Sequence, residues 1–170
     1  MKTTVTMQPI TRKLNIYLAD DDQADCLLFK EALEELPVSA NLTTVHDGEQ
    51  LLDLLTQKGN KLPDVLFLDL NMPRKNGFAA LGQIKRDEKL LDLPVMVFST
   101  ANDQTKVMAV FRDAAHYYIR KPAKFSELKE VIYKALALIA AGNMQLPKQE
   151  NFVLSGELKS TPDESTPSKK

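Results

Sequence analysis

Apolar and polar positions follow two different patterns along this chain, and each pattern predicts one kind of secondary structure. Short apolar runs at residues 14–19, 65–68 and 95–98 end in polar or turn-forming residues, which is typical of strands buried on both faces of a parallel sheet. Between these runs, apolar residues recur three and four positions apart, which is typical of amphipathic helices. The two patterns alternate along the chain, which predicts five strands that are each followed by a helix.

The alternation predicts an α/β fold with a five-stranded parallel sheet covered by five helices on both faces. The expected strands are residues 14–19, 41–45, 65–68, 95–98 and 117–119. A helix is expected after each strand: the first stops at Pro37, the second ends near Gly59, the third opens at Asn76-Gly77, the fourth spans roughly 103–113 and the fifth stops at Gly142.

The two ends of the chain differ in composition from its centre. Residues 1–12 are polar and predict a short arm, so the expected domain covers residues 13–143. Over residues 144–170, prolines, serines, threonines and lysines dominate, which predicts a disordered tail. This tail contains one apolar island, Phe152-Val153-Leu154, which could pack on the domain or dock on a partner.

Charge and cysteine content narrow the classes of function. The formal net charge is −1, from 22 basic and 23 acidic residues, which favours neither nucleic acid nor a membrane surface as a partner. No apolar run is long enough to span a bilayer, and the N-terminus has no apolar signal core. The single cysteine, Cys26, cannot form an internal disulfide and fits a reducing compartment, so we expect a cytoplasmic protein.

Polar residues capable of chemistry stand at the expected carboxyl ends of the strands. They are Asp20 and Asp21 after the first strand, Asp69 after the third, Ser99 after the fourth and Lys121 after the fifth. A parallel sheet brings these ends together along one edge, where open α/β sheets bind their ligands. We therefore expect these side chains to share one cleft.

Three carboxylates in one cleft repel each other, and a bound cation would relieve that repulsion. Oxygen ligands of this kind suit Mg²⁺, which usually keeps several waters. The ammonium of Lys121 could contact a phosphoryl oxygen, and a hydroxyl could donate a hydrogen bond to another. With metal and lysine in place, Asp69 could act as the nucleophile toward a phosphoryl group and form an acyl phosphate.

Each of these residues also has a plainer interpretation. Asp22 could be the N-cap of the first helix, Ser99 and Thr100 could cap the fourth helix, and a lysine before Pro122 is more often a surface residue. The order of the residues favours the functional interpretation, because each stands at the end of the appropriate strand.

Four motifs stand in order along the chain: Asp20-Asp21, the stretch Leu-Asp-Leu-Asn-Met-Pro at 68–73 with Gly77, Val-Phe-Ser-Thr at 97–100, and Tyr-Ile-Arg-Lys-Pro at 118–122. Together they resemble the receiver domain of bacterial two-component response regulators, the CheY-like family. The resemblance spans about residues 13–141, which is most of the chain. It implies a doubly wound, flavodoxin-like sheet with strand order 2-1-3-4-5.

The resemblance implies phosphoryl acceptance and metal binding as the chemistry. Asp69 would be the phosphoacceptor, and Lys121 would contact the phosphate. Mg²⁺ would be held by Asp20, Asp21, Asp69 and the backbone carbonyl of Asn71. Beyond its own phosphorylation and dephosphorylation, the chain is not expected to be an enzyme.

The resemblance also implies how the signal would leave the site. Ser99 would be the switch hydroxyl and would swing toward the phosphate, after which Tyr118, the switch aromatic, would move inward. The Lys121–Pro122 peptide bond would be cis, a form that mainly proline permits. Three positions depart from the family pattern: Ser99 where threonine is commoner, Ala114-Ala115-His116 where Gly-Ala-Asp or Gly-Ala-Asn is frequent, and Arg120 where an apolar residue is frequent.

Two other classes of function fit parts of the pattern. Haloacid-dehalogenase-type phosphatases also use a strand-end aspartate, and Asp69-Leu-Asn71 resembles their Asp-x-Asp motif. Their second aspartate is Asn71 here, and their acidic metal-binding pair follows the lysine, whereas Asp20-Asp21 precedes it. A receiver-like fold that only binds partners is the third possibility, and the intact acidic pair, Asp69 and Lys121 argue against it.

The tail shows no second set of helices or strands, so a stand-alone, single-domain receiver is expected, with a layout like that of the regulators encoded with phytochrome-type kinases. Its phosphodonor would be a histidine kinase or a phosphotransfer protein. A downstream protein or a second copy would bind the face made by the fourth helix, the fifth strand and the fifth helix. That face is expected to carry Lys106, Val110, Arg112, Tyr117 and the exposed side of residues 129–137.

Overall fold

The computed structural model describes residues 7–101, 103–142 and 145–156. Its strands are β1 Ile10–Ala19, β2 Val38–Val45, β3 Val65–Leu68, β4 Val95–Ser99, β5 Tyr117–Arg120 and β6 Val153–Leu154. All of these strands run parallel in one sheet, in the order β2-β1-β3-β4-β5-β6. The parallel sheet and the order of its first five strands are as predicted, and a sixth strand extends the sheet past β5.

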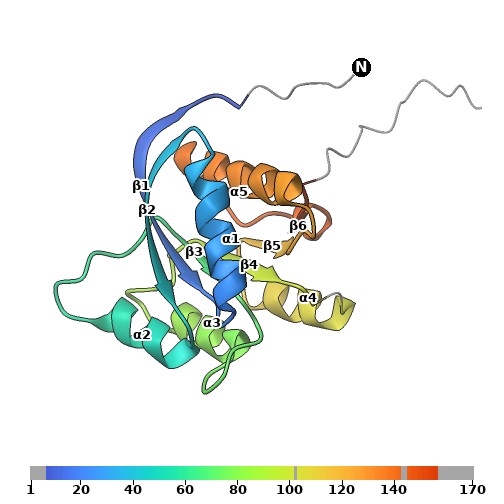
Figure 1. Ribbon diagram of the computed structural model, residues 1–170. Coiled ribbons are helices and arrows are strands. Elements are labelled where there is room, and N and C mark those ends of the chain that lie inside the picture. Colours follow the sequence, from blue (N-terminus) through green and yellow to red (C-terminus); the bar gives the residue numbers. More distant parts are fainter. Residues whose placement is uncertain (1–6, 102, 143–144, 157–170) are drawn as a thin grey trace, which may run out of the picture.

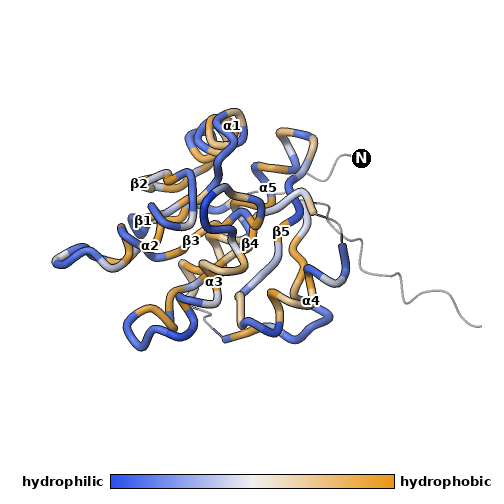
Figure 2. The backbone as a smooth tube through the Cα atoms, turned by 90° about the horizontal axis from the view of Figure 1, so that it is seen from below, coloured by the Kyte–Doolittle hydropathy of each residue, from blue (hydrophilic) through white to orange (hydrophobic). Residues whose placement is uncertain are grey.

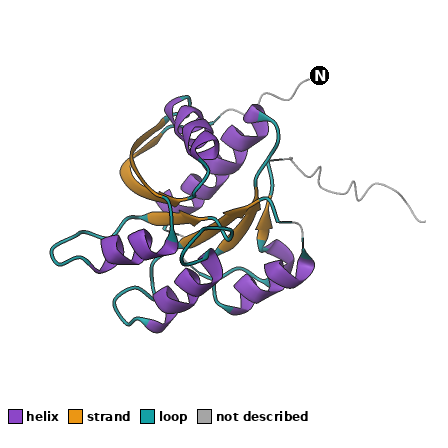
Figure 3. Ribbon diagram, turned by 60° about the horizontal axis from the view of Figure 1, so that its bottom comes forward, coloured by secondary structure: helices purple, strands orange, loops and turns teal. Residues whose placement is uncertain are grey.

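Five α-helices connect the strands: α1 Gln23–Glu34, α2 Gly48–Thr56, α3 Gly77–Arg86, α4 Gln104–Arg112 and α5 Phe125–Ala140. A short 3₁₀ helix, η1 Gln149–Asn151, precedes β6. Helices α1 and α5 lie together on one face of the sheet, and α2, α3 and α4 cover the other (Figure 1, Figure 3). This doubly wound arrangement is the predicted architecture. Among the described residues, no helix combines the length and the apolarity needed to cross a membrane.

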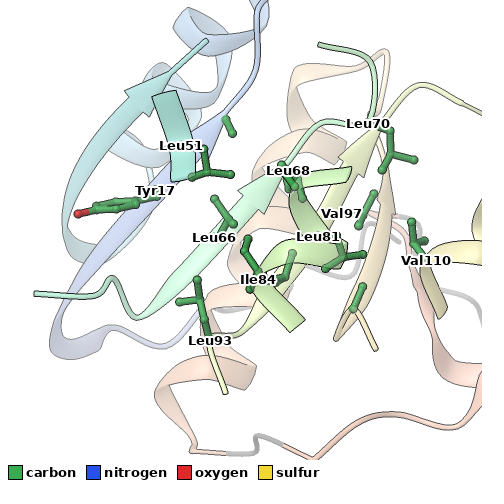
Figure 4. Packing of buried hydrophobic residues seen from close by; sticks show 14 of the residues in the cluster. Tyr17, Leu51, Leu66, Leu68, Leu70, Leu81, Ile84, Leu93, Val97 and Val110 are labelled. Carbon is green, nitrogen blue, oxygen red and sulfur yellow. The ribbon is translucent and has the colours of Figure 1, made fainter. Parts of the chain in front are cut away.

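The central strand β3 contributes to two separate cores. Leu66 and Leu68 are buried on the side of α2, α3 and α4, whereas Val65 and Phe67 are buried under α1 and α5. Successive side chains of a strand point to opposite faces, so a strand covered on both faces is apolar throughout. Figure 4 shows Leu66 and Leu68 beside Leu81 of α3, and Figure 2 shows the apolar residues concentrated between the layers.

Short polar side chains begin four of the helices. Asp22, Asp47, Asn76 and Asp103 are the N-caps of α1 to α4, and each accepts a hydrogen bond from a backbone N–H of the first turn. Such caps stabilise a helix by about 1 kcal/mol each. The interpretation of Asp22 as an N-cap is therefore confirmed. Gly142 follows α5 with φ of 72°, the left-handed conformation that ends many helices.

The apolar island of the predicted tail is part of the sheet. Val153 and Leu154 pair with Tyr118 and Ile119 of β5, and the Tyr118 N–H donates to the Phe152 carbonyl at 3.0 Å. The disorder expected from residue 144 onward is therefore wrong for residues 149–154, because η1 and β6 form there. Residues 144 and 157–170 of the expected tail, and residue 143 of the expected domain, lie outside the described residues.

Phe152 anchors this C-terminal segment, residues 149–156. Its side chain is 1% exposed and meets Phe111 of α4 edge to face, with ring centroids 5.1 Å apart. On the other side of the segment, Lys134 of α5 donates from Nζ to the Ser155 carbonyl at 2.9 Å. The segment therefore contacts both α4 and α5 while it pairs with β5.

The first two strands are longer than predicted. β1 begins at Ile10, inside the expected arm, and Ile10 pairs with Val38 at the start of β2. The ladder is interrupted between Ile10 and Leu14. These extensions carry mostly polar residues, so the apolar pattern did not reveal them. Residues 1–6 of the expected arm lie outside the described residues.

Candidate functional site

The topology brings the predicted site residues to one end of the sheet. Asp20 follows β1, Asp69 follows β3, Ser99 ends β4 and Lys121 follows β5. These four strands are consecutive neighbours in a parallel sheet, so their carboxyl ends lie side by side. Thr100, next to Ser99, points out to solvent.

Three carboxylates form a compact group, the acidic trio, at this end. One oxygen from each of Asp20, Asp21 and Asp69 lies within 4.8 Å of the other two. Asp20 and Asp69 are buried, whereas Asp21 is exposed. Carboxylate oxygens at this spacing fit a divalent cation. Such a cation would offset the negative charge of the three carboxylates, which a single lysine cannot fully neutralise. The exposure of Asp21 leaves the trio accessible from solvent.

The ammonium of Lys121 brings a positive charge to the site. Nζ donates to Asp20 Oδ2 at 2.7 Å and to Asp25 Oδ2 at 2.8 Å, and it lies 3.7 Å from Asp69 Oδ2. Burial disfavours the charged lysine, but its hydrogen bonds to Asp20 and Asp25 outweigh burial, so the net effect is a raised pKa for Lys121. The ammonium also lies 5.3 Å from the centroid of the Phe98 ring. Lys121 is therefore charged at neutral pH.

Asp25 is a residue of the site that the sequence pattern did not indicate. It lies in the first turn of α1, where an acidic residue has an ordinary explanation as a favourable charge at a helix N-terminus. The available signal was its spacing from the N-cap Asp22. A side chain at the third position after the cap is directed toward the start of the helix, and the start of α1 adjoins the strand ends.

Burial raises the pKa of the Asp69 carboxyl from its ordinary value of 3.8 to about 6. The ammonium of Lys121 opposes this rise, and the carboxylate of Asp20 adds to it. The backbone N–H of Asn71 donates to Asp69 Oδ1 at 3.4 Å, which also favours the charged form. Asp69 is therefore mostly ionised at neutral pH and mostly protonated at pH 5.

The loop after β3 passes close behind Asp69. Gly77 begins α3, and its N–H donates to the Leu70 carbonyl at 3.0 Å. A Cβ on Gly77 would lie 2.2 Å from the Asp69 carbonyl oxygen, so only glycine permits this approach. Asn71 belongs to the same loop, and the role of its carbonyl as a metal ligand stays a prediction.

Ser99 and Tyr118 lie next to each other behind the site. The Oγ of Ser99 accepts the Ala101 N–H at 3.2 Å, and the Tyr118 hydroxyl donates to the Ala101 carbonyl at 2.5 Å. Burial raises the pKa of Tyr118, and a hydrogen bond with Ser99 opposes the rise. Tyr118 is 0% exposed. The Tyr118 ring is therefore buried, and its role as the switch aromatic stays a prediction.

Two expectations around the site are wrong. No peptide bond of the described residues is cis, so Lys121–Pro122 is trans; prolyl bonds favour trans by only about 0.5–1 kcal/mol, so the sequence does not decide the isomer. Val110, expected on the partner-binding face, is buried in the core under α4, because its position on the helix turns it toward the sheet. Of the other expected residues, Arg112 is exposed, and Lys106 and Tyr117 are half-buried.

The fold and the site together define a class: doubly wound α/β domains with an acidic cleft and a lysine at the carboxyl ends of the strands. A family model described as the response regulator receiver domain matches residues 16–133. The chain belongs to this family, as the four motifs indicated.

Several proteins of known or probable role are similar to this chain. The probable methanogenesis regulatory protein FilR2 of Methanothrix harundinacea is 32% identical over 120 residues, which cover 69% of this chain and 77% of that protein. The structure of the phosphorylated cyanobacterial phytochrome response regulator RcpA is 33% identical with a TM-score of 0.69, and the match covers 81% of this chain and 100% of RcpA. The Mn²⁺-bound form of response regulator Rcp1, a protein of Synechocystis, is 27% identical with a TM-score of 0.67, covering 79% of this chain and 99% of that one.

Proposed function

We propose that this chain is a response regulator that accepts a phosphoryl group on Asp69 from a histidine kinase or phosphotransfer protein and then changes its binding to other proteins. The observation that carries the proposal is the setting of Asp69. This buried carboxylate is within 4.8 Å of the oxygens of Asp20 and Asp21, and 3.7 Å from the ammonium of Lys121. Membership of the receiver family supports the same assignment.

The transfer is a displacement at phosphorus. A carboxylate oxygen of Asp69 forms the new bond to phosphorus while the bond from phosphorus to the donor imidazole nitrogen breaks, and its electron pair leaves with the imidazole. Asp69 attacks in its ionised form, which its pKa of about 6 provides at neutral pH. Lys121 is close enough to reach a phosphoryl oxygen, and the Ser99 hydroxyl donates to another.

We propose Mg²⁺ as the cation of the acidic trio, with the backbone carbonyl of Asn71 as a further ligand. When bound, the ion would reduce the repulsion between Asp69 and the incoming phosphoryl group. The choice of Mg²⁺ rests on the all-oxygen set of ligands and on the exposure of Asp21, because Mg²⁺ keeps part of its water shell. A Mn²⁺-bound form of the similar protein Rcp1 is consistent with a divalent ion in this family.

The relatives and the surface of the chain support a proposal for the partners. RcpA is a phytochrome response regulator, so we propose a phytochrome-type histidine kinase as the donor. For the downstream protein, or a second copy, we propose the part of the α4-β5-α5 face that the C-terminal segment leaves open, including Arg112. The net charge of −1 and the free Cys26 fit a cytoplasmic protein whose partners are neither nucleic acid nor membrane.

The deciding experiment is incubation with acetyl phosphate and Mg²⁺, followed by measurement of the intact mass. We expect the native chain to gain one phosphoryl group and Asp69→Asn to gain none, because an amide is a poor nucleophile. Asp53→Asn, which changes an exposed carboxylate of α2, is the matched control and should behave as the native chain does. A full adduct on Asp69→Asn would place the acceptor elsewhere.

A second assay separates this proposal from a phosphatase. Small phosphate esters should not be turned over repeatedly, because a receiver is consumed by its own phosphorylation until the acyl phosphate is hydrolysed. Sustained release of phosphate from such esters, lost in Asp69→Asn, would favour the dehalogenase-type alternative.

A further inference from the structure

Lys121 is held off centre in the site. Its Nζ lies 2.7 Å from Asp20 Oδ2 and 2.8 Å from Asp25 Oδ2, but 3.7 Å from Asp69 Oδ2, which is beyond hydrogen-bond length. The lysine side chain is 10% exposed, so the surrounding atoms leave its ammonium few other positions. The two short contacts draw the ammonium toward β1 and α1 and away from Asp69.

Only one of the two carboxylates that hold Lys121 belongs to the acidic trio. Asp20 is a member, and a cation bound there would draw on its charge and weaken its attraction for the ammonium. Asp25 is not a member. Its contact with Lys121 would therefore persist when the trio binds a metal.

Both ends of this contact are fixed by the backbone. Asp25 is the third residue after Asp22, whose side chain accepts the Asp25 N–H at 3.1 Å. The N–H of Lys121 donates to the Ser99 carbonyl at 2.9 Å. The helix dipole explains an acidic residue in the first turn of α1, but it does not explain why that side chain reaches Lys121.

We propose that Asp25 is a positioning residue that holds the Lys121 ammonium away from Asp69 and so limits how readily the site accepts a phosphoryl group. The inference rests on the proposed function of Asp69. A phosphoryl oxygen bound to Asp69 competes with Asp25 for the same ammonium, and each contact is a charge-assisted hydrogen bond. Removal of the Asp25 charge removes the competitor.

The test compares Asp25→Asn with Asp22→Asn at saturating Mg²⁺. Both variants remove one negative charge from the start of α1, and asparagine caps a helix as well as aspartate does, so Asp22→Asn controls for charge and for helix stability. The readouts are the dissociation constant of beryllofluoride, a phosphoryl mimic, and the rate of phosphorylation by acetyl phosphate. We expect tighter binding and faster phosphorylation in Asp25→Asn, each by about threefold or more, and changes below about twofold in Asp22→Asn.

A further readout requires no phosphoryl chemistry. The ¹⁵N signal of the Lys121 ammonium, recorded without metal or donor, should move in Asp25→Asn and stay in place in Asp22→Asn. An unmoved signal in Asp25→Asn, or equal binding and equal rates in the two variants, overturns the inference. Native protein that takes up neither beryllofluoride nor a phosphoryl group overturns the proposed function, and the inference with it, even where the ammonium signal moves.

Discussion

Asp69 is 5% exposed at the end of an apolar strand, and its pKa in the folded protein, about 6, lies above the ordinary value of 3.8. Between these two values the folded chain binds more protons than the unfolded chain. Stability therefore falls as the pH rises from about 4 to about 6, and it stays lower at higher pH. The ionised carboxylate that the proposed phosphoryl transfer needs is the form that destabilises the metal-free fold.

We predict that Asp69→Asn stabilises the metal-free protein at pH 8 but not at pH 4, because the neutral amide avoids the burial of charge that only the higher pH imposes. The difference between the two gains should be of the order of 3 kcal/mol at most. Denaturant unfolding at both pH values measures it. The exposed Asp53→Asn is the control, and equal gains at the two pH values would contradict the assignment of the raised pKa.

Ala114 has a backbone conformation that does not suit its residue type. Its φ is 62°, a left-handed conformation that disfavours a residue with a Cβ, and it stands where the family often has glycine. We predict that Ala114→Gly stabilises the protein by about 1 kcal/mol, because glycine adopts this conformation without strain. Gly59 has φ of 76° with nothing near its Cβ position, so Gly59→Ala should shift the thermal midpoint in the opposite direction. A loss of stability in Ala114→Gly would contradict this explanation.

At the residue scale, the site residues that follow a strand could be predicted from the sequence. Asp25, which lies in a helix, could not. Asp20 and Asp69 each end an apolar run, and Lys121 follows the short run at 117–119 by one residue, so their positions could be predicted from the pattern. Asp25 lies within a helix, where acidic residues are common, and its contact with Lys121 depends on how α1 is placed against the sheet. The spacing of residues along the sequence does not determine how α1 packs against the sheet.

At the scale of elements, the periodicity of apolar residues predicted the five strands β1 to β5 and the five α-helices, each of which is at least four residues long. β6 is different, because a strand of two residues has no periodicity. It forms because Phe152 fits against Phe111 and because β5 offers backbone groups for pairing. The sequence therefore showed the apolar island but left open whether it packs on the domain or on a partner.

We predict that Phe152→Ala lowers the free energy of unfolding by about 3 kcal/mol, the low end for a buried phenylalanine, because a segment with only two residues of strand can detach and limit the loss. The matched control is Val153→Ala in the same segment, whose side chain is 44% exposed and should matter little. Denaturant unfolding measures both. Amide exchange of Tyr118, which donates to the Phe152 carbonyl, should speed up in Phe152→Ala only; unchanged exchange would show that the segment is held by other contacts.

At the scale of the whole molecule, a metal ion bound by the acidic trio would link metal binding to folding. Its members follow β1 and β3, which are far apart in sequence, so the unfolded chain cannot present the same group of oxygens. A ligand that binds only the folded state stabilises it by mass action.

We predict that Mg²⁺ at one hundred times its dissociation constant stabilises the native chain by about 2.7 kcal/mol, and that chelation reverses the effect. Asp21→Ala should lose most of this gain at the same Mg²⁺ concentration, because it removes a ligand that is exposed and thus dispensable for the core. Unfolding midpoints with and without Mg²⁺ measure the effect, and Asp53→Ala serves as the control. An equal gain in Asp21→Ala would exclude that residue from the metal site.

The parallel sheet has two edge strands, and the presence of β6 means that β5 is not one of them. Without residues 149–156, β5 would present a row of unpaired N–H and C=O groups to solvent, and such an edge is a template for pairing with another chain. The pairing of Tyr118 and Ile119 with β6 closes that row with only two residues of strand. A chain shortened before residue 149 would therefore tend to aggregate through β5, even under conditions in which its helices and its acidic cleft stay intact.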